Sequence, residues 1–185
     1  RANFQRKFSL KLFNTDAKIY VGQAKLHKRL FASIKRYPNH ILGSGYGSDL
    51  IFIIGLPRCG STLIEAILSM ADNTNCFGEG SFLPKVIDEL QIIKFLEKEE
   101  FTDIDFKQKI SLINHCYKKE IGLTHGKSID KTLTNFYLAG IISRVWPAAK
   151  IVHVERKPLD QILSAWKSRF EKGHSYSLDL NDLVK

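Results

Sequence analysis

Residues 51–65 read Ile-Phe-Ile-Ile-Gly-Leu-Pro-Arg-Cys-Gly-Ser-Thr-Leu-Ile-Glu, and this stretch decides the fold. Four apolar residues in a row, three of them β-branched, predict a strand buried on both faces of a parallel sheet. A turn bounded by Gly55 and Gly60 follows, and the apolar pattern that resumes after it predicts a buried helix. A strand, a glycine-bounded loop and a helix form a phosphate cradle, because N–H groups of the loop and of the first helical turn point at one spot.

The loop differs from a Walker A phosphate loop at one position. Its glycine spacing is that of G-x-x-x-x-G, but Ser61 follows the second glycine where a Walker A loop has lysine. Kinases and NTPases need that lysine on the β- and γ-phosphates, and an acidic residue to hold Mg²⁺. Thr62 offers the usual hydroxyl, whereas the predicted strand residues 151–154, Ile-Val-His-Val, are followed by Glu155 and Arg156 rather than by aspartate. The sequence therefore favours an anionic ligand carried without a metal, and a glycine turn that binds nothing is the alternative.

Composition and charge limit the class of protein. The chain has 185 residues, which fits one domain, and its apolar fraction of 44% is ordinary for a globular protein. The formal net charge of +9 predicts an anionic ligand or partner, such as nucleic acid, membrane lipid or a polyphosphorylated small molecule. Three widely spaced cysteines argue against a disulfide scaffold, and His115 with Cys116 lacks the second ligand pair of a metal site.

The sequence contains no stretch long enough for a membrane span and no visible signal peptide. We therefore expect a cytoplasmic protein. The chain starts at Arg1 rather than at methionine, so a native N-terminal segment with a targeting signal can precede it.

Strands alternate with helices along the chain, which predicts an α/β fold, a phosphate-loop-type parallel β-sheet flanked by helices. We expect two helical pieces within 1–40, helices at about 82–97, 103–119, 135–146 and 158–172, and strands at 51–54, 128–130 and 150–155. His153 stands among valines and is expected to be a core residue. The Gly- and Ser-rich residues 42–49 mark a boundary between an N-terminal helical extension at 1–48 and the phosphate-loop domain at 49–185.

Two motifs resemble those of sulfotransferases that use 3′-phosphoadenosine 5′-phosphosulfate (PAPS). Residues 56–62, Leu-Pro-Arg-Cys-Gly-Ser-Thr, resemble the loop that holds the 5′-phosphosulfate. Residues 151–164 resemble the 3′-phosphate motif, in which an arginine ends a strand and a serine follows eight positions later, as Ser164 follows Arg156. The resemblance covers roughly residues 48–185, and it is closest to tyrosylprotein-sulfotransferase-like proteins and to bacterial sulfotransferases that follow tetratricopeptide repeats.

The resemblance implies a role for each residue of the site. The residues implied to bind the cofactor are Pro57, Arg58, Cys59, Gly60, Ser61 and Thr62 for the phosphosulfate, and Arg156 and Ser164 for the 3′-phosphate. Glu79 matches the general base of the tyrosylprotein-type enzymes, and Lys131 and Arg58 are implied to stabilise the transition state. Without the resemblance, Glu79 reads as a solvated loop residue and Lys131 as a surface lysine. Cytosolic small-molecule sulfotransferases carry a catalytic histidine two positions after this lysine, where this chain has Leu133, which again favours Glu79.

The implied reaction is metal-free, in-line transfer of a sulfuryl group from PAPS to an acceptor hydroxyl, with PAP as the product. The acceptor stays open between a peptide tyrosine, a glycan and a small metabolite, and so does the oligomeric state. The sequence departs from the family at Cys59, where serine is usual, and at its end, because family members usually continue beyond this point. We therefore expect a chain truncated at its C-terminus.

Two other function classes remain as alternatives. A phosphate-loop nucleotide kinase or NTPase is disfavoured by Ser61 in the lysine position. A non-catalytic basic module that binds nucleotides or nucleic acid would explain the charge, but no aromatic-rich sheet signature or recognition helix is visible. We expect no nucleic-acid partner.

Overall fold

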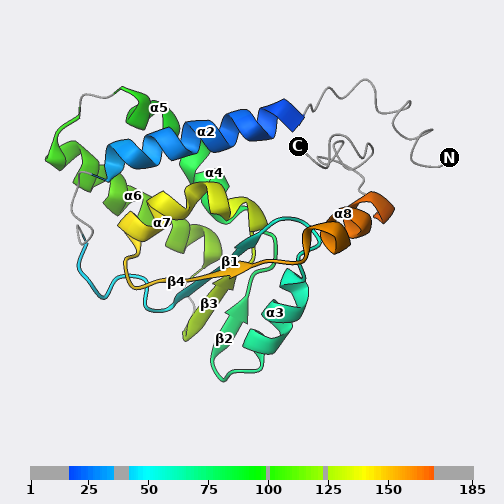
Figure 1. Ribbon diagram of the computed structural model, residues 1–185. Coiled ribbons are helices and arrows are strands. Elements are labelled where there is room, and N and C mark those ends of the chain that lie inside the picture. Colours follow the sequence, from blue (N-terminus) through cyan, green and yellow to red (C-terminus); the bar gives the residue numbers. More distant parts are fainter. Residues whose placement is uncertain (1–16, 36–41, 99–100, 123–124, 169–185) are drawn as a thin grey trace.

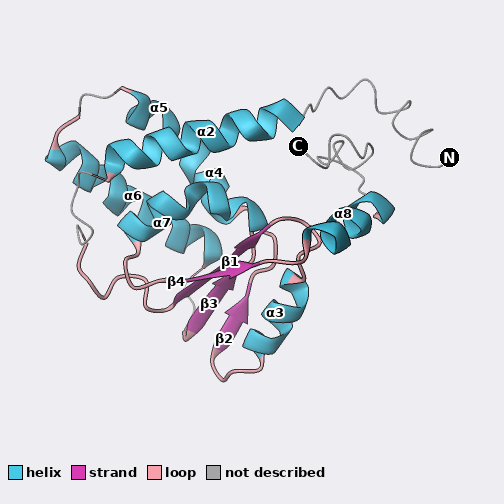
Figure 2. Ribbon diagram, in the orientation of Figure 1, coloured by secondary structure: helices cyan, strands magenta, loops and turns pink. Residues whose placement is uncertain are grey.

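The computed structural model describes residues 17–35, 42–98, 101–122 and 125–168. The first predicted helical piece, at about 4–13, and the end of the last predicted helix lie outside these residues. Within them, four parallel strands form one sheet in the order β2-β3-β1-β4 (Figures 1 and 2). Helices flank this sheet, which confirms the predicted fold class.

The strand that opens the decisive stretch lies in the middle of the sheet. The strands are β1 (Leu50–Gly55), β2 (Thr74–Cys76), β3 (Lys127–Asp130) and β4 (Lys150–Val154). β1 pairs with β3, where Phe52 lies opposite Asp130, and with β4, where Ile53 lies opposite Val152. Phe52 and Ile53 point to opposite faces of the sheet and both are fully buried, as the apolar run predicts.

Most of the helices pack on one face of the sheet. They are α2 (Ala17–Ile34), α4 (Phe82–Glu89), α5 (Ile92–Glu97), α6 (Asp103–Ile121), the 3-10 helix η1 (Leu133–Leu138) and α7 (Ala139–Val145). The core of this layer includes Phe52, Tyr117 and Trp146, whose ring centroids lie 4.7–5.8 Å apart. α2 lies across α5 and η1 and adds Leu30 and Ile34 to the same core.

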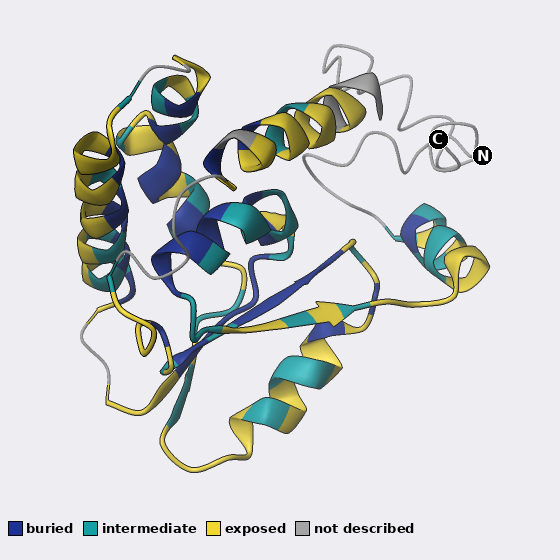
Figure 3. Cartoon of the chain, turned by 60° about the vertical axis from the view of Figure 1, so that its left-hand side comes forward, coloured by how far each residue is buried: buried dark blue, intermediate teal, exposed yellow. Residues whose placement is uncertain are grey.

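The other face carries α3 (Ser61–Ser69), which contacts β1 and β2, and α8 (Pro158–Lys167) follows β4. Figure 3 shows that burial is concentrated in β1 and in the helices of the first face, whereas α3 and α8 are largely intermediate or exposed. The described helices include none with both the length and the apolar character needed to cross a membrane.

The structure corrects two predicted elements and adds a strand that was not predicted. The single helix predicted at about 82–97 is two helices, because Gln91 between them adopts a left-handed backbone with a φ of 51°. The helix predicted at 135–146 starts as the tighter η1 before it becomes α7. β2 is not among the predicted strands, and its Asn75 pairs with Ser128 of β3.

Two elements that were predicted to be buried are exposed on one side. Leu63 and Ile67 of α3 are 66% and 54% exposed, so the prediction of a buried helix was wrong. β4 lies at one edge of the described sheet, with β1 as its one neighbouring strand among the described residues, and its Ile151 is exposed as well. His153 is exposed and its Nδ1 lies 3.3 Å from Glu155 Oε1, so it is not the core histidine that its valine neighbours predicted.

Candidate functional site

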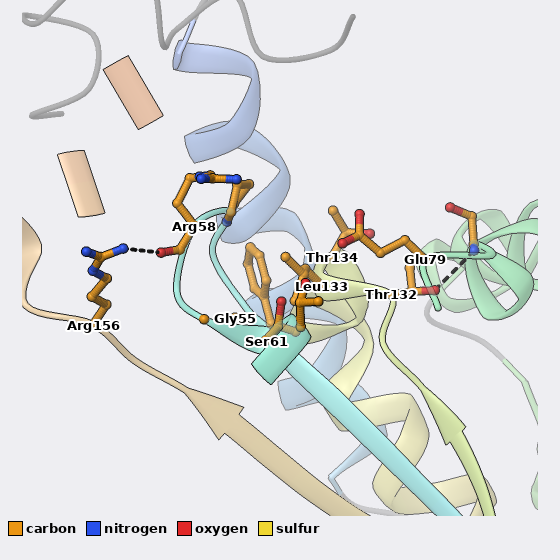
Figure 4. Close-up of a pocket in the computed structure, with 13 residues that line it drawn as sticks. Gly55, Arg58, Ser61, Glu79, Thr132, Leu133, Thr134 and Arg156 are labelled. Atoms are coloured by element: carbon orange, nitrogen blue, oxygen red, sulfur yellow. Dashed lines mark hydrogen bonds between the residues drawn. The ribbon is translucent and has the colours of Figure 1, made fainter. Parts of the chain in front are cut away.

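The strands end at one edge of the sheet, and a pocket of about 450 Å³ lies there (Figure 4). Its lining comes from segments that follow all four strands. The lining residues are Gly55, Pro57, Arg58, Gly60, Ser61, Thr62, Glu79, Ser81, Thr132, Leu133, Thr134, Phe136 and Arg156. Ligands of open α/β sheets bind at this edge, so the pocket is the candidate site.

The loop after β1 is held tightly against the sheet. A Cβ at Gly55 would lie 2.6 Å from the Val154 carbonyl oxygen, so only glycine fits where β1 passes β4. The Cys59 N–H donates to the Leu56 carbonyl at 3.2 Å and closes the turn. The Cys59 side chain is buried beneath the loop, which leaves the main-chain donors in place.

The loop leads directly into the N-terminus of α3. Arg58 and Gly60 both have a left-handed backbone, with φ of 70° and 103°. Glycine takes this conformation at no cost, whereas Arg58 is strained by on the order of 1 kcal/mol. Gly60 is the N-cap of α3 and has no side chain to cap the helix, and Ser61 and Thr62 of the first turn line the pocket. The positive end of the helix dipole therefore faces the pocket.

Residues of the second motif, at 151–164, contact the loop after β1 directly. Arg156 Nη1 donates to the Arg58 carbonyl at 3.4 Å, and Arg58 Nε donates to Ser164 Oγ at 3.1 Å. Gln161 Nε2 donates to the Pro57 carbonyl at 3.0 Å. Arg156 also lines the pocket, whereas Ser164 is not among the lining residues and contacts Arg58. The two motifs are about a hundred residues apart in sequence and form one structure; Gln161 was not predicted, although it lies one helical turn before Ser164.

Lys131 lies beside the pocket and is not a surface lysine. Its side chain is 9% exposed, and its Nζ lies 2.9 Å from Glu65 Oε2 and 3.4 Å from Thr62 Oγ1. The same atom lies 4.0 Å from Glu79 Oε1. Glu65 is 14% exposed, and its other carboxylate oxygen has no hydrogen-bond partner among the described residues. Glu65 was not predicted as a site residue. Its one signal in the sequence is its position three residues after Thr62, on the same face of α3.

Glu79 faces the pocket from the segment after β2. Its side chain is 61% exposed, and the backbone beside it is held by the Lys131 N–H, which donates to the Gly78 carbonyl at 3.0 Å. Figure 4 shows Glu79 and Arg156 on opposite sides of the loop. The pocket therefore has guanidinium groups at one side and a carboxylate at the other.

A buried network that the sequence analysis missed supports the turn after β3. Asp130 Oδ2 accepts from the Tyr117 hydroxyl at 2.9 Å, and Asp130 Oδ1 accepts from the Thr132 N–H at 2.8 Å. Thr132 Oγ1 in turn accepts from the Ser81 N–H at 3.1 Å, which links this turn to the start of α4. Burial, and after it the negative charge of Asp130, raises the pKa of Tyr117 well above its ordinary value. The network thereby fixes the backbone that presents Lys131.

The donors around the loop suit an anionic group: the guanidinium groups of Arg58 and Arg156, the hydroxyls of Ser61 and Thr62, and a helix N-terminus. Among the described residues, no three His, Cys, Asp or Glu side chains are grouped so that they could hold a metal ion.

Comparison with known proteins identifies the family. Residues 49–184 match the sequence profile of the sulfotransferase family, which is well over half of the chain. The chain belongs to the sulfotransferase family. An uncharacterized protein of Aquifex aeolicus (strain VF5) is 29% identical in an alignment of 142 positions, which covers 71% of this chain and 19% of that protein. This sulfotransferase chain thus spans about a fifth of the length of that relative.

Membership of the sulfotransferase family agrees with the architecture. The parallel sheet, with a phosphate loop between β1 and α3, is consistent with the phosphate-loop-type fold of sulfotransferases. The matched residues contain every pocket residue, and they support sulfuryl transfer in general. α2 lies before the matched residues.

Proposed function

We propose that the chain binds PAPS in this pocket and transfers a sulfuryl group to an acceptor hydroxyl without a metal. The observation that carries the proposal is the contact of Arg156 and Ser164 with Arg58, because it joins both phosphate-binding motifs at one pocket. PAPS would supply a sulfuryl group already activated by its bond to a phosphate. The division into residues 1–48 and 49–185 is part of the same proposal.

The residues of the pocket fit the two anionic ends of PAPS. The 5′-phosphosulfate would be bound by the loop of Pro57, Arg58, Cys59, Gly60, Ser61 and Thr62. Its donors would be N–H groups of Gly60, Ser61 and Thr62, the Ser61 and Thr62 hydroxyls and the Arg58 guanidinium. Pro57 has no N–H and the Cys59 N–H is bonded to Leu56, so these two residues would shape the turn. The 3′-phosphate would be bound by Arg156 and Ser164. The Ser164 oxygen accepts from Arg58, so its own O–H remains able to donate to a phosphate oxygen.

Glu79 would act as the general base. Its carboxylate is exposed to the pocket, where it would take the proton of the acceptor hydroxyl. The acceptor oxygen then forms a bond to sulfur while the bond between sulfur and the 5′-phosphate oxygen breaks, and the electron pair leaves with PAP. Proton transfer of this kind contributes on the order of 10²–10⁴ in rate.

Lys131 and Arg58 would stabilise the charge that develops on the departing group. The Lys131 ammonium is fixed beside the loop by Glu65 and Thr62, so no reorganisation is needed when the charge appears. Leu133 lines the pocket, which supports Glu79 rather than a histidine as the base. Glu79, together with Leu133 in place of a histidine, also supports the proposal that this chain is most similar to the tyrosylprotein-type and tetratricopeptide-repeat-linked members of the family.

Binding of PAP, the desulfated product, tests the donor site by thermal shift. Saturating PAP, at about 100 times its dissociation constant, should stabilise the chain by about 2.7 kcal/mol, which corresponds to roughly 5–11 °C. Arg156→Ala should need at least about tenfold more PAP for the same shift, because it loses a charge-assisted phosphate contact. Lys150→Ala is the matched control, because it removes the same charge at the opposite end of β4.

An unchanged PAP midpoint in Arg156→Ala would contradict the proposed site. Stabilisation by Mg²⁺-ATP without any response to PAP would instead favour a phosphate-loop kinase or NTPase.

A further inference from the structure

A second hollow of about 310 Å³ continues from the pocket, between α2, α4 and η1, and we call it the α2 groove. Thr134 of η1 lines both hollows. Along α4, Pro84 lines the groove one turn after Ser81 lines the pocket. Phe136 lines the pocket and Tyr137 the groove, and their ring centroids lie 4.0 Å apart. The two hollows are therefore successive parts of one surface, with Glu79 at the pocket end.

The two parts carry different charges. The pocket has Arg58 and Arg156, whereas the described residues that line the α2 groove include no Lys or Arg and one acid, Asp88. His27 also lines the groove, and burial lowers its pKa more than its hydrogen bond with the Tyr137 backbone raises it, so its ring is uncharged at neutral pH. The Lys and Arg side chains that give the chain its net charge of +9 are thus not among the described residues that line the groove. A negative group placed there would meet Asp88 without a cation among the lining residues.

One wall of the groove comes from a part of the chain that the family match does not include. Gln23 and His27 of α2 line the groove, and α2 ends before the matched residues 49–184 begin. α2 is nevertheless firmly seated, because Leu30 and Ile34 are buried in the core of the domain. The wall is therefore a fixed surface, as a site that selects a ligand requires.

We propose that the α2 groove binds the body of the acceptor, and that this acceptor is an uncharged molecule with an apolar body and one hydroxyl directed at Glu79. The inference rests on the proposed sulfuryl transfer and narrows its acceptor. Tyr137 and Pro84 offer apolar surface to such a body, and Gln23 offers a hydrogen-bonding amide. Anionic acceptors, such as acidic peptides or glycans that carry carboxylates, are disfavoured by Asp88. α2 then shares in selecting the acceptor with Pro84, Asp88 and Tyr137, which lie within the matched residues.

Two probes that differ at one terminal group, a methyl in one and a carboxylate in the other, test this proposal. They are para-pentylphenol and the analogue whose pentyl chain ends in a carboxylate, and each is titrated into PAP-saturated chain at neutral pH by saturation-transfer NMR. We expect the uncharged phenol to bind at least about tenfold more tightly than the carboxylate. Asp88→Lys should remove or reverse this preference. Asp72→Lys, an exposed acid outside both hollows, makes the same change in net charge and should leave the preference as it is.

A second pair of variants tests the place of binding. Gln23→Trp puts a large ring on the groove wall and should weaken the phenol at least about tenfold, with no change in the PAP midpoint. Lys25→Trp places the same ring on an exposed part of α2 outside the lining and should have no effect.

Equal or tighter binding of the carboxylate by the unmodified chain would overturn the proposal, and so would unchanged phenol binding in Gln23→Trp. If PAP stabilises the chain but neither probe binds, the groove proposal fails and the donor site stands. If PAP itself has no effect, the proposed function fails, and the groove proposal fails with it.

Discussion

Replacing Lys131 by methionine tests how strongly a buried ion pair supports the site. The Lys131 Nζ and Glu65 Oε2 atoms lie 2.9 Å apart, and the two side chains are only 9% and 14% exposed. Methionine fills a similar volume but leaves the Glu65 carboxylate without its cation. One oxygen of that carboxylate already has no hydrogen-bond partner among the described residues, so the remaining charge would be poorly solvated.

The expected loss is large for a single substitution. Breaking a buried pair from one side costs about 3–5 kcal/mol, and the slight exposure of Glu65 favours the lower end. For a chain of this size, a loss of about 3 kcal/mol lowers the midpoint of thermal unfolding by roughly 6–12 °C. Urea unfolding followed by circular dichroism gives the free energy of unfolding, and thermal unfolding gives the midpoint.

The chain contains a control pair with nearly the same geometry. Lys85 Nζ and Glu120 Oε2 lie 2.8 Å apart, but their side chains are 53% and 29% exposed. Lys85→Met should therefore have a far smaller effect than Lys131→Met, because water screens and replaces the exposed pair. In the double variant Lys131→Met, Glu65→Leu, part of the lost stability should return, since no buried charge is left. Equal losses in the two lysine variants, or simple additivity in the double variant, would refute the reasoning.

Two further predictions concern the supports of the site. In the folded state the pKa of Tyr117 lies well above its ordinary value of 10.0. The folded state therefore binds more protons than the unfolded state at alkaline pH, and the free energy of unfolding should fall as the pH rises above about 10. Tyr117→Phe should make the free energy of unfolding less dependent on pH in this range, and equal slopes for the two proteins would argue against the shift. Gly55→Ala should cost about 1–3 kcal/mol, because its Cβ would meet the Val154 carbonyl, whereas Gly22→Ala, in open space on α2, should stabilise by about 0.5–1 kcal/mol. If Gly55→Ala and Gly22→Ala shift the midpoint of urea unfolding in the same direction, these two predictions are wrong.

Local patterns in the sequence were enough to predict three of the four described strands and the phosphate loop. The run of four apolar residues, Gly55 and Gly60 specify a strand, a turn and a helix through conformational preferences that act over a few residues. The same patterns could not show whether a further layer covers an element. Leu63 of α3 and Ile151 of β4 are apolar yet exposed, because burial depends on which other segments pack against them. The break at Gln91 was missed for a similar reason, since helix propensity alone favours one continuous helix.

For the site, the sequence by itself determined the motifs, and through them the family. The residue types at Arg58, Glu79, Lys131, Arg156 and Ser164 could be read directly, as could the positions of Arg58, Lys131 and Arg156 after predicted strands. Only the tertiary structure decided their partners: Arg58 meets Ser164, and Lys131 is paired with Glu65. It also placed α2 beside the pocket and so created the groove. Such contacts join residues that are tens to more than a hundred positions apart, and no local preference encodes them; they arise only when the packed core brings the elements together.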